Sequence, residues 1–189
     1  MKTKFILHGG FNPKATIQED DSFFNEILKD TPSNPKLLLV YFAKEVDRIQ
    51  KNMNEDIVQF TKNSNGRNIS FELAEEEKFL EQIPSADVIY LHGGSTKKIL
   101  ETIVKFSNLD ELFKGKIVAA DSAGVNAISK YCYSQRGGIL RGVGIIPYKI
   151  ICHYTEELKD KIEELNKYDN NLELLLLKEL ETKVFVTNE

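Results

Sequence analysis

The sequence has little of what marks several large classes of protein. It contains only two cysteines, Cys132 and Cys152, in 189 residues, which is too few for the disulfide framework of a small secreted domain. No apolar run approaches the roughly 20 residues that cross a bilayer. The short apolar run near the N-terminus ends at Gly9 and Gly10, so no signal peptide is predicted. We therefore expect a cytoplasmic protein with no membrane partner.

An excess of positive charge is also missing. The chain has 25 Lys and Arg residues against 29 Asp and Glu residues, which gives a net charge of -4. Binding to nucleic acid would call for a concentrated basic face, so we expect no nucleic-acid partner. The length suits a single domain over residues 1–189 with a sizeable core, as a monomer or a small homo-oligomer.

Apolar runs alternate along the chain with segments of helical periodicity. We expect helices at residues 20–30 and 45–63, after Thr96, from the Ser122 region to about Tyr133, and at 155–166. Residues 172–177 are predicted to be helical and residues 134–144 to form a loop. The strands are predicted at residues 4–8, 36–42, 68–73, 87–91, 116–120 and 183–187. Because these runs are continuously apolar, they predict an α/β fold with a doubly wound, mostly parallel sheet and helices on both faces.

One stretch, residues 116–127, has the pattern of a nucleophile elbow. Ser122 lies between a β-branched apolar run and the start of a helix, with Ala120 and Gly124 at the flanking positions of the x-x-Ser-x-Gly motif. Small residues suit a strained turn, and the amides of the following helix favour negative charge that develops near the serine. The same residues also suit an ordinary helix N-cap, so this motif alone leaves both interpretations open.

A serine nucleophile needs a base, and the chain offers only three histidines, each just after an apolar run. His153 is the only one after Ser122, and we predict that it is the base. His8 and His92 precede glycine pairs and are expected to shape loops, with His92 also a candidate for contact with substrate. No acidic residue lies between Ser122 and His153, so with this base the chain order of an α/β-hydrolase does not apply.

The group that orients the base has several candidates. Asp121 is a poor one, because neighbouring side chains on a strand point to opposite faces. Glu156 and Glu157 begin a charged helix and suit its N-terminal charge preference. Glu179 and Glu181 precede the last predicted strand, where a carboxylate could reach the edge of the sheet.

An oxyanion hole needs two backbone amides that face the reacting carbonyl. The amide of Ala123 follows the predicted nucleophile and supplies one of them. Gly93 and Gly94 end a neighbouring strand and allow close approach to a substrate, so they are the candidates for the other.

Three motifs in this order resemble the peptidase E (aspartyl dipeptidase) and cyanophycinase family of serine peptidases. They are Leu91-His92-Gly93-Gly94-Ser95-Thr96, Asp121-Ser122-Ala123-Gly124-Val125-Asn126, and Gly144-Ile145-Ile146-Pro147 leading to Cys152-His153-Tyr154. The resemblance implies a fold similar to class I glutamine amidotransferases, with Ser in place of Cys. It also implies hydrolysis of peptide bonds after an N-terminal or linked aspartate, without a metal or cofactor.

The resemblance assigns Ser122 as nucleophile and His153 as base. One glycine of the Gly93-Gly94 pair and the amide of Ala123 match the oxyanion hole. The family places a glutamate near the start of its last strand, and Glu179 is favoured over Glu181 for this role.

The chain departs from the family pattern in two places. The aspartate that peptidase E carries between Cys132 and Gly144 is missing, and so is the arginine expected soon after the histidine. Arg136 and Arg141 are our candidates to bind an acidic substrate group instead.

The sequence therefore predicts a serine peptidase that acts on short peptides with a Ser-His-Glu triad. Two alternatives remain open. One is an esterase or amidase that uses the same Ser-His pair. The other is a non-catalytic relative that binds a small acidic ligand at the same edge of the sheet.

Overall fold

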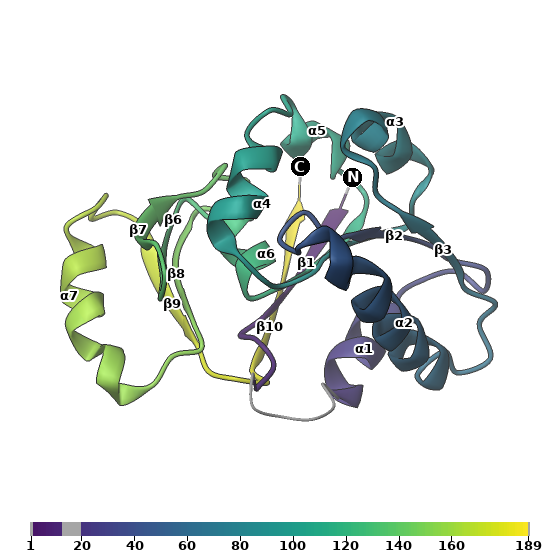
Figure 1. Cartoon of the computed structure of the whole chain (residues 1–189), viewed down its shortest axis with the longest axis horizontal. Helices are drawn as coiled ribbons and strands as arrows, with labels where there is room; N and C mark the ends of the chain where they lie inside the picture. Colours follow the sequence, from purple (N-terminus) through teal and green to yellow (C-terminus); the bar gives the residue numbers. More distant parts are fainter. Residues whose placement is uncertain (1, 13–19, 189) are drawn as a thin grey trace.

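The computed structural model describes residues 2–12 and 20–188, and their strands form two sheets (Figure 1). The six-stranded sheet has the order β10-β1-β5-β4-β2-β3, and the four-stranded sheet has the order β7-β6-β8-β9. In the first sheet only β10 is antiparallel to its neighbour, and in the second only β7 is. The α/β class with mostly parallel strands is confirmed, but the strands are divided between two sheets.

The first sheet and its helices come from the N-terminal two thirds of the chain and its last strand. They are β1 (Lys2–His8), α1 (Asp21–Leu28), β2 (Lys36–Val40), α2 (Val46–Lys62), β3 (Ser70–Leu73), the 3-10 helix η1 (Glu76–Lys78), α3 (Phe79–Gln82), the 3-10 helix η2 (Ile83–Ser85), β4 (Val88–Leu91), α4 (Thr96–Ile103), α5 (Leu109–Leu112), β5 (Ile117–Asp121), α6 (Ala123–Ile128) and β10 (Thr182–Asn188). The second sheet and its helices are β6 (Tyr131–Ser134), β7 (Gly138–Arg141), β8 (Tyr148–Cys152), the 3-10 helix η3 (Glu156–Leu158), α7 (Lys159–Asn166) and β9 (Glu173–Leu177).

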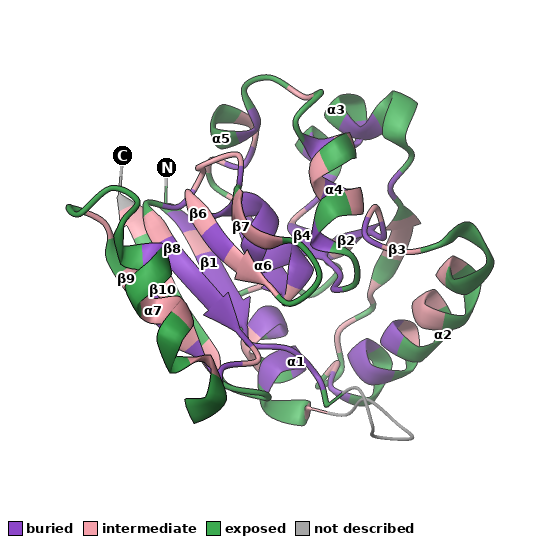
Figure 2. Ribbon diagram, turned by 60° about the vertical axis from the view of Figure 1, so that its left-hand side comes forward, coloured by how far each residue is buried: buried purple, intermediate pink, exposed green. Residues whose placement is uncertain are grey.

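Helices cover both faces of the first sheet because its strands are apolar on both sides. On one face, alternate strand residues such as Leu37 and Leu39 pack against aromatic residues of α1 and α2. On the other face, Leu38 and Val40 belong to a cluster that includes residues of α3 to α6. In Figure 2 the central strands are buried, whereas α2 and α7 expose their outer sides. The carboxyl ends of β1, β4 and β5 meet at one edge, which is where this class of fold places its sites.

The second sheet joins the same core through one of its faces. Cys132, Ile150 and Leu175 belong to the cluster that also contains the residues of α6. The opposite face packs against α7 through Ile151 and Leu165. This packing brings the end of β8 next to the start of α6. No helix in the described ranges is long and apolar enough to cross a membrane.

Two predictions around α6 were wrong. The helix ends at Ile128 rather than near Tyr133, because the chain folds back onto its end: the N–H groups of Val143 and Ile146 donate to the carbonyls of Ala127 and Ile128 at 2.8 and 3.0 Å. Within the expected loop at residues 134–144, Gly138–Arg141 forms β7 and pairs with β6. Glycine-rich composition concealed this hairpin.

The predicted helix at residues 172–177 is instead strand β9. Leu175 and Leu177 face the main core, while Leu174 and Leu176 face α7. Since both faces are covered, the run lacks the polar alternation of a half-exposed strand. A short run of this kind cannot be told from a helical segment by periodicity.

Candidate active site

Ser122 occupies a strained turn between β5 and α6. Its φ and ψ are 42° and -98°, a conformation that non-glycine residues seldom adopt. The turn is held by the Ser122 N–H, which donates to the carbonyl of His8 at 3.0 Å. Gly124 is needed for close packing, because a Cβ there would lie 2.3 Å from the Leu91 carbonyl oxygen. The geometry is that of a nucleophile elbow, which presents the hydroxyl at the sheet edge.

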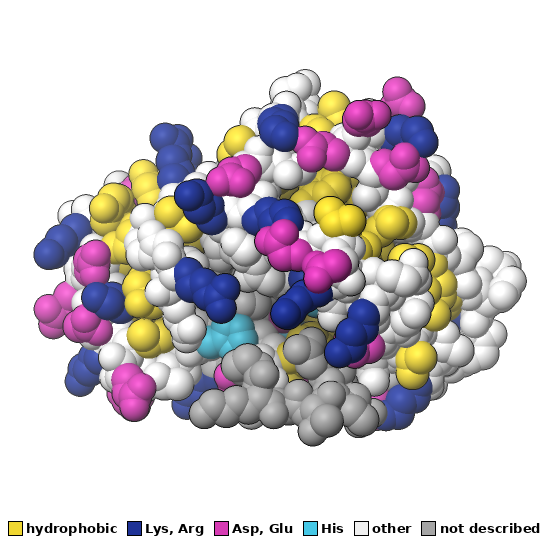
Figure 3. Space-filling model, in the orientation of Figure 1, with side chains coloured by type: hydrophobic (Ala, Val, Ile, Leu, Met, Phe, Trp, Pro, Cys, Tyr) yellow, Lys and Arg dark blue, Asp and Glu magenta, His cyan; other side chains and the backbone are white. Residues whose placement is uncertain are grey.

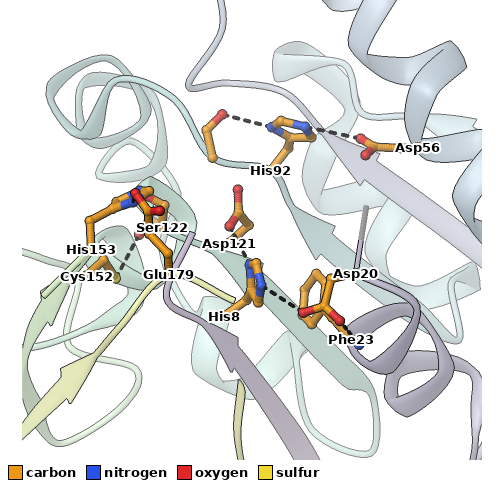
Figure 4. A network of polar contacts seen from close by, with 11 residues as sticks. His8, Asp20, Phe23, Asp56, His92, Asp121, Ser122, Cys152, His153 and Glu179 are labelled. Atoms are coloured by element: carbon orange, nitrogen blue, oxygen red, sulfur yellow. Dashed lines mark hydrogen bonds and ion pairs between the residues drawn. The ribbon is translucent and has the colours of Figure 1, made fainter. Parts of the chain in front are cut away.

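His153 approaches the serine from the other sheet. It follows β8, and its Nε2 lies 3.0 Å from Ser122 Oγ (Figure 4). Its backbone has a positive φ of 52°, and its N–H donates to the carbonyl of Gly9 at 2.9 Å. A Cβ on Gly10 would lie 2.2 Å from the imidazole ring, so only glycine leaves room for it. The Gly9-Gly10 pair therefore supports the histidine, a role that the sequence did not reveal.

Of the two candidate glutamates, Glu179 lies against the histidine. Its Oε1 is 3.4 Å from His153 Nδ1, on the side of the ring opposite the serine. Glu181 Oε2 instead accepts a hydrogen bond from the N–H of Lys178 at 2.9 Å, within the β9–β10 turn. The Glu179 side chain is 39% exposed, so its contact with the ring is screened by water.

The Gly93-Gly94 pair lies beside the elbow, after β4. A Cβ on Gly93 would be 2.2 Å from Asp121 Oδ2, and one on Gly94 would be 2.5 Å from the carbonyl oxygen of Ala43. Gly94 also has a φ of 151°, a backbone conformation that is unfavourable for residues other than glycine. Ala123 is the first residue of α6, so its N–H has no partner within the helix. Gly93 therefore packs against the residue before Ser122, and Ala123 follows Ser122 directly in the chain.

Beneath the elbow lies a buried pair that the sequence analysis did not find. His8 is fully buried, and its Nδ1 is 2.8 Å from Asp121 Oδ1. Its Nε2 lies 3.3 Å from Asp20 Oδ2. Burial alone would raise the pKa of Asp121, but the hydrogen bond with His8 and the nearby histidines bring it below its usual value. The two partners are 113 residues apart, so only the pairing of β1 with β5 brings them together.

His92 does not reach the surface at which we expected it to contact substrate. Only 2% of the residue is exposed. Its Nδ1 lies 2.8 Å from the carbonyl oxygen of Gly93, and its Nε2 lies 3.3 Å from Asp56 Oδ2 (Figure 4). The same carboxylate oxygen accepts a hydrogen bond from the hydroxyl of Tyr41 at 2.6 Å. The ring is therefore enclosed, with both nitrogens in contact with protein atoms.

The two arginines proposed for substrate binding lie at opposite ends of β7. Arg136 is in the exposed turn between β6 and β7, at the same end of the sheet as His153. Arg141 pairs with Tyr131 at the other end, next to the C-terminus of α6. Since Ser122 precedes the N-terminus of that helix, only Arg136 is at the correct end of the second sheet.

Figure 3 shows a hollow with a histidine at its edge and several Lys and Arg side chains around it. Of the three histidines, His8 and His92 are buried, and the side chain of His153 is partly exposed. A further cation near this region is Lys44, which follows Ala43 and is half-buried. Burial lowers the pKa of its ammonium, although the charges of Asp121 and Asp56 act in the opposite direction. Among the described residues no carboxylate forms an ion pair with it.

In the described ranges no group of three or more His, Cys, Asp or Glu side chains is arranged to hold a metal ion. Both cysteines are buried and unpaired. Burial raises the pKa of the Cys132 thiol to about 12 and that of the Cys152 thiol well above its usual value, which keeps both protonated near neutral pH. Neither has the thiolate character of a reactive cysteine.

Comparison with solved structures gives the same fold. A peptidase from an acI-B1 Actinobacterium superimposes with a TM-score of 0.70 at 18% identity, over 99% of this chain and 88% of that one. A putative peptidase E protein from Listeria monocytogenes EGD-e superimposes with a TM-score of 0.65 at 14% identity, over 100% of both chains. No curated protein matches the sequence.

The match to a family agrees with the geometry of the site. Residues 5–189 match peptidase family S51, so the matched region contains the elbow, the histidine and both glycine pairs. The chain therefore belongs to peptidase family S51 and is a serine-type peptidase.

Proposed function

We propose that the protein hydrolyses short peptides with Ser122 as nucleophile, His153 as general base and acid, and Glu179 as the group that orients His153. The observation that carries this proposal is the 3.0 Å separation of Ser122 Oγ and His153 Nε2 at a strained elbow. In this mechanism the serine attacks the peptide carbonyl while its proton passes to Nε2. The same nitrogen then donates that proton to the departing amine, and water releases the acyl group by the reverse steps.

The developing oxyanion is stabilised by the N–H groups of Ala123 and of one glycine of the Gly93-Gly94 pair. Both lie beside Ser122, and the helix that begins at Ala123 adds the favourable end of its dipole. One such donor is worth about 10² to 10³ in kcat in serine peptidases.

The proposed substrates carry an acidic group, with an N-terminal aspartate as the first to be tested. The support is the group of Lys and Arg side chains around the hollow, to which Arg136 and Lys44 are candidate contributors; within residues 2–12 and 20–188 no carboxylate is paired with Lys44. An ammonium that is partly desolvated and lacks an ion-pair partner is well suited to a carboxylate. Two buried thiols also agree with a reducing compartment, and we propose the cytoplasm.

The test is labelling by a fluorophosphonate probe together with hydrolysis of dipeptide amides that begin with Asp, Ala, Leu or Lys. Wild type should be labelled and should hydrolyse the Asp-first amide, whereas Ser122→Ala should do neither. Ser107→Ala, at an exposed serine outside the site, is the matched control and should behave as wild type. If the corresponding dipeptide esters, tested alongside, are cleaved and the amides are not, the protein is an esterase. If a folded wild type is neither labelled nor active, the catalytic proposal is wrong.

A variant at Lys44 tests the substrate preference separately. We expect Lys44→Met to lower kcat/KM for the Asp-first amide by about 10-fold, the effect of a lost charge-assisted hydrogen bond, and to leave that for the Leu-first amide unchanged. An equal loss on both amides would mean that Lys44 does not select for an acidic group.

A further inference from the structure

The buried His92 lies one residue before the glycine pair of the proposed oxyanion hole, and the donor of its hydrogen bond with Gly93 can be assigned. A backbone carbonyl only accepts hydrogen bonds, so Nδ1 of His92 must carry the hydrogen in its 2.8 Å contact with the carbonyl oxygen of Gly93. This contact restrains the Gly93 carbonyl. In a trans peptide the carbonyl and the following N–H point in opposite directions, so the direction of the Gly94 N–H is restrained as well.

Among the described residues, no other hydrogen bond joins the Gly93 carbonyl or the Gly94 N–H. Glycine also has no side chain that would limit the orientation of this peptide group. The next fixed point along the chain is the N–H of Ser95, which donates to the carbonyl of Ala43 at 2.9 Å. Between β4 and this point, the imidazole of His92 is the side chain that holds the Gly93 carbonyl.

The other side of the imidazole is held by Asp56 and Tyr41. Asp56 Oδ2 lies 3.3 Å from Nε2 and 2.6 Å from the Tyr41 hydroxyl. The tyrosine and histidine rings also pack, with centroids 5.0 Å apart. The three residues are 2–5% exposed, so water does not compete for these contacts. Nδ1 keeps its hydrogen whether or not Nε2 also carries one, because the Gly93 carbonyl needs a donor.

We propose that His92, held by Asp56 and Tyr41, is a positioning residue that orients the Gly93–Gly94 peptide so that the Gly94 N–H faces the oxyanion formed at Ser122. The proposal rests on the catalytic function proposed above. It assigns to this chain's His92 a task that a substrate contact would not explain, because the ring is enclosed. The residue acts through the backbone and does not touch the reacting atoms.

Two substitutions distinguish the effect of the Nδ1 contact with Gly93 from the effect of the Nε2 contact with Asp56. In His92→Asn the amide nitrogen can occupy the place of Nδ1 and donate to the Gly93 carbonyl, although the contact with Asp56 is lost. In His92→Gln the longer side chain can reach Asp56, but its donor no longer lies near the Gly93 carbonyl. Both changes place an uncharged amide in the same buried site.

The measurement is the rate constant for labelling of Ser122 by a fluorophosphonate, whose phosphoryl oxygen occupies the oxyanion hole. We expect His92→Gln to label about 10- to 100-fold more slowly than wild type, up to the effect of one lost oxyanion donor. His92→Asn should label within about 3-fold of wild type, because the donor to the carbonyl is kept. On a peptide amide the loss in His92→Gln should fall on kcat and leave KM unchanged.

A measurement on the unmodified protein covers the case in which a variant fails to fold. Long-range proton–nitrogen NMR at neutral pH should show His92 Nδ1 protonated. A deprotonated Nδ1 would overturn the proposal. So would wild-type labelling by folded His92→Gln while Ser122→Ala remains unlabelled, an outcome that leaves the catalytic proposal standing. Failure of wild type itself to label would instead count against the catalytic proposal.

Discussion

All three histidines lie at the end of a strand or directly after one and have a carboxylate against the ring, yet they differ in what surrounds them. His153 and Glu179 lie at the surface, with side chains 25% and 39% exposed, where β8 meets the first sheet. His8–Asp121 and His92–Asp56 are enclosed under the same edge. A histidine that must exchange protons with substrate needs access to it, whereas one that holds backbone in place needs enclosure. Similar residue pairs thus have different tasks because of their burial.

The two enclosed pairs also differ from each other. The pKa of Asp121 lies below its usual value, because the 2.8 Å hydrogen bond with His8 and the charges of nearby histidines outweigh its burial. The pKa of Asp56 lies above its usual value, because burial outweighs His92 and the Tyr41 hydroxyl. The folded protein therefore favours the anion at Asp121 and disfavours it at Asp56.

The largest effect should come from the exposed pair. We expect His153→Ala to lower the rate of probe labelling by about 10⁴-fold or more, since loss of the base removes the activation of the serine. The free energy of unfolding should change by less than about 1 kcal/mol, because the side chain is partly exposed. Labelling kinetics and urea unfolding check the two parts. Unchanged labelling would show that His153 is not the base.

The next largest expected effect is a difference in the free energy of unfolding between variants of the two enclosed pairs, His8–Asp121 and His92–Asp56. Asp121→Asn should lower the free energy of unfolding by about 3 kcal/mol, because it removes a buried anion that the fold stabilises and leaves His8 without its charged partner. Asp56→Asn should lower the free energy of unfolding by only about 1 kcal/mol, because burial disfavours the anion at that site. Urea unfolding at neutral pH compares them. Equal losses would contradict the difference between the pairs.

The pH dependence should have opposite signs at the two sites. The folded pKa of Asp121 is lowered, so its stabilising contribution is complete above the ordinary value of about 4 and is lost as the pH falls through the lowered pKa. The folded pKa of Asp56 is raised, so its contribution is complete below about 4 and decreases as the pH rises toward the raised pKa.

Unfolding free energies of wild type, Asp121→Asn and Asp56→Asn, measured from pH about 3 to 7, reveal each contribution by difference. Each slope can reach about 1.4 kcal/mol per pH unit. Slopes of the same sign would show that one of the two directions is wrong.

The smallest effect distinguishes the two glutamates of the β9–β10 turn. Glu179→Gln should slow probe labelling by about 10-fold or less, because its 3.4 Å contact with His153 is long and partly exposed to water. Glu181→Gln is the matched control, since its carboxylate contacts only the turn. A larger loss in Glu181→Gln than in Glu179→Gln would reverse the assignment of the orienting acid.

The sequence predicted the alternation of strands and helices, and its ordered motifs predicted the family. At Ser122 the small residues within a few positions of the serine indicated a tight turn, and the other ordered motifs were needed to favour a nucleophile elbow over a helix N-cap. Local composition was insufficient at β7, where glycines concealed a strand, and at β9, where leucines on both faces removed the alternation.

The environment of each histidine was beyond local patterns. From the sequence, His8 was expected to shape a loop and Asp121 was a poor candidate to orient the base. Only the pairing of β1 with β5 places the two side chains together. His92 was expected to shape a loop and was a candidate for contact with substrate, but the contact with Asp56 from α2 encloses it. The role of Glu179 remains a prediction that Glu179→Gln tests, and the roles of Arg136 and Arg141 in substrate binding remain predictions.

Because Ser122 directly follows a strand of the six-stranded sheet and His153 directly follows a strand of the four-stranded one, the distance between their side chains depends on how the two sheets pack together. A slight separation of the sheets would break the Ser–His hydrogen bond while each hydrogen-bonded ladder stayed whole. In mild denaturant, catalysis should therefore be lost before circular dichroism records any melting. Loss of activity would then report the separation of the two sheets before any secondary structure is lost.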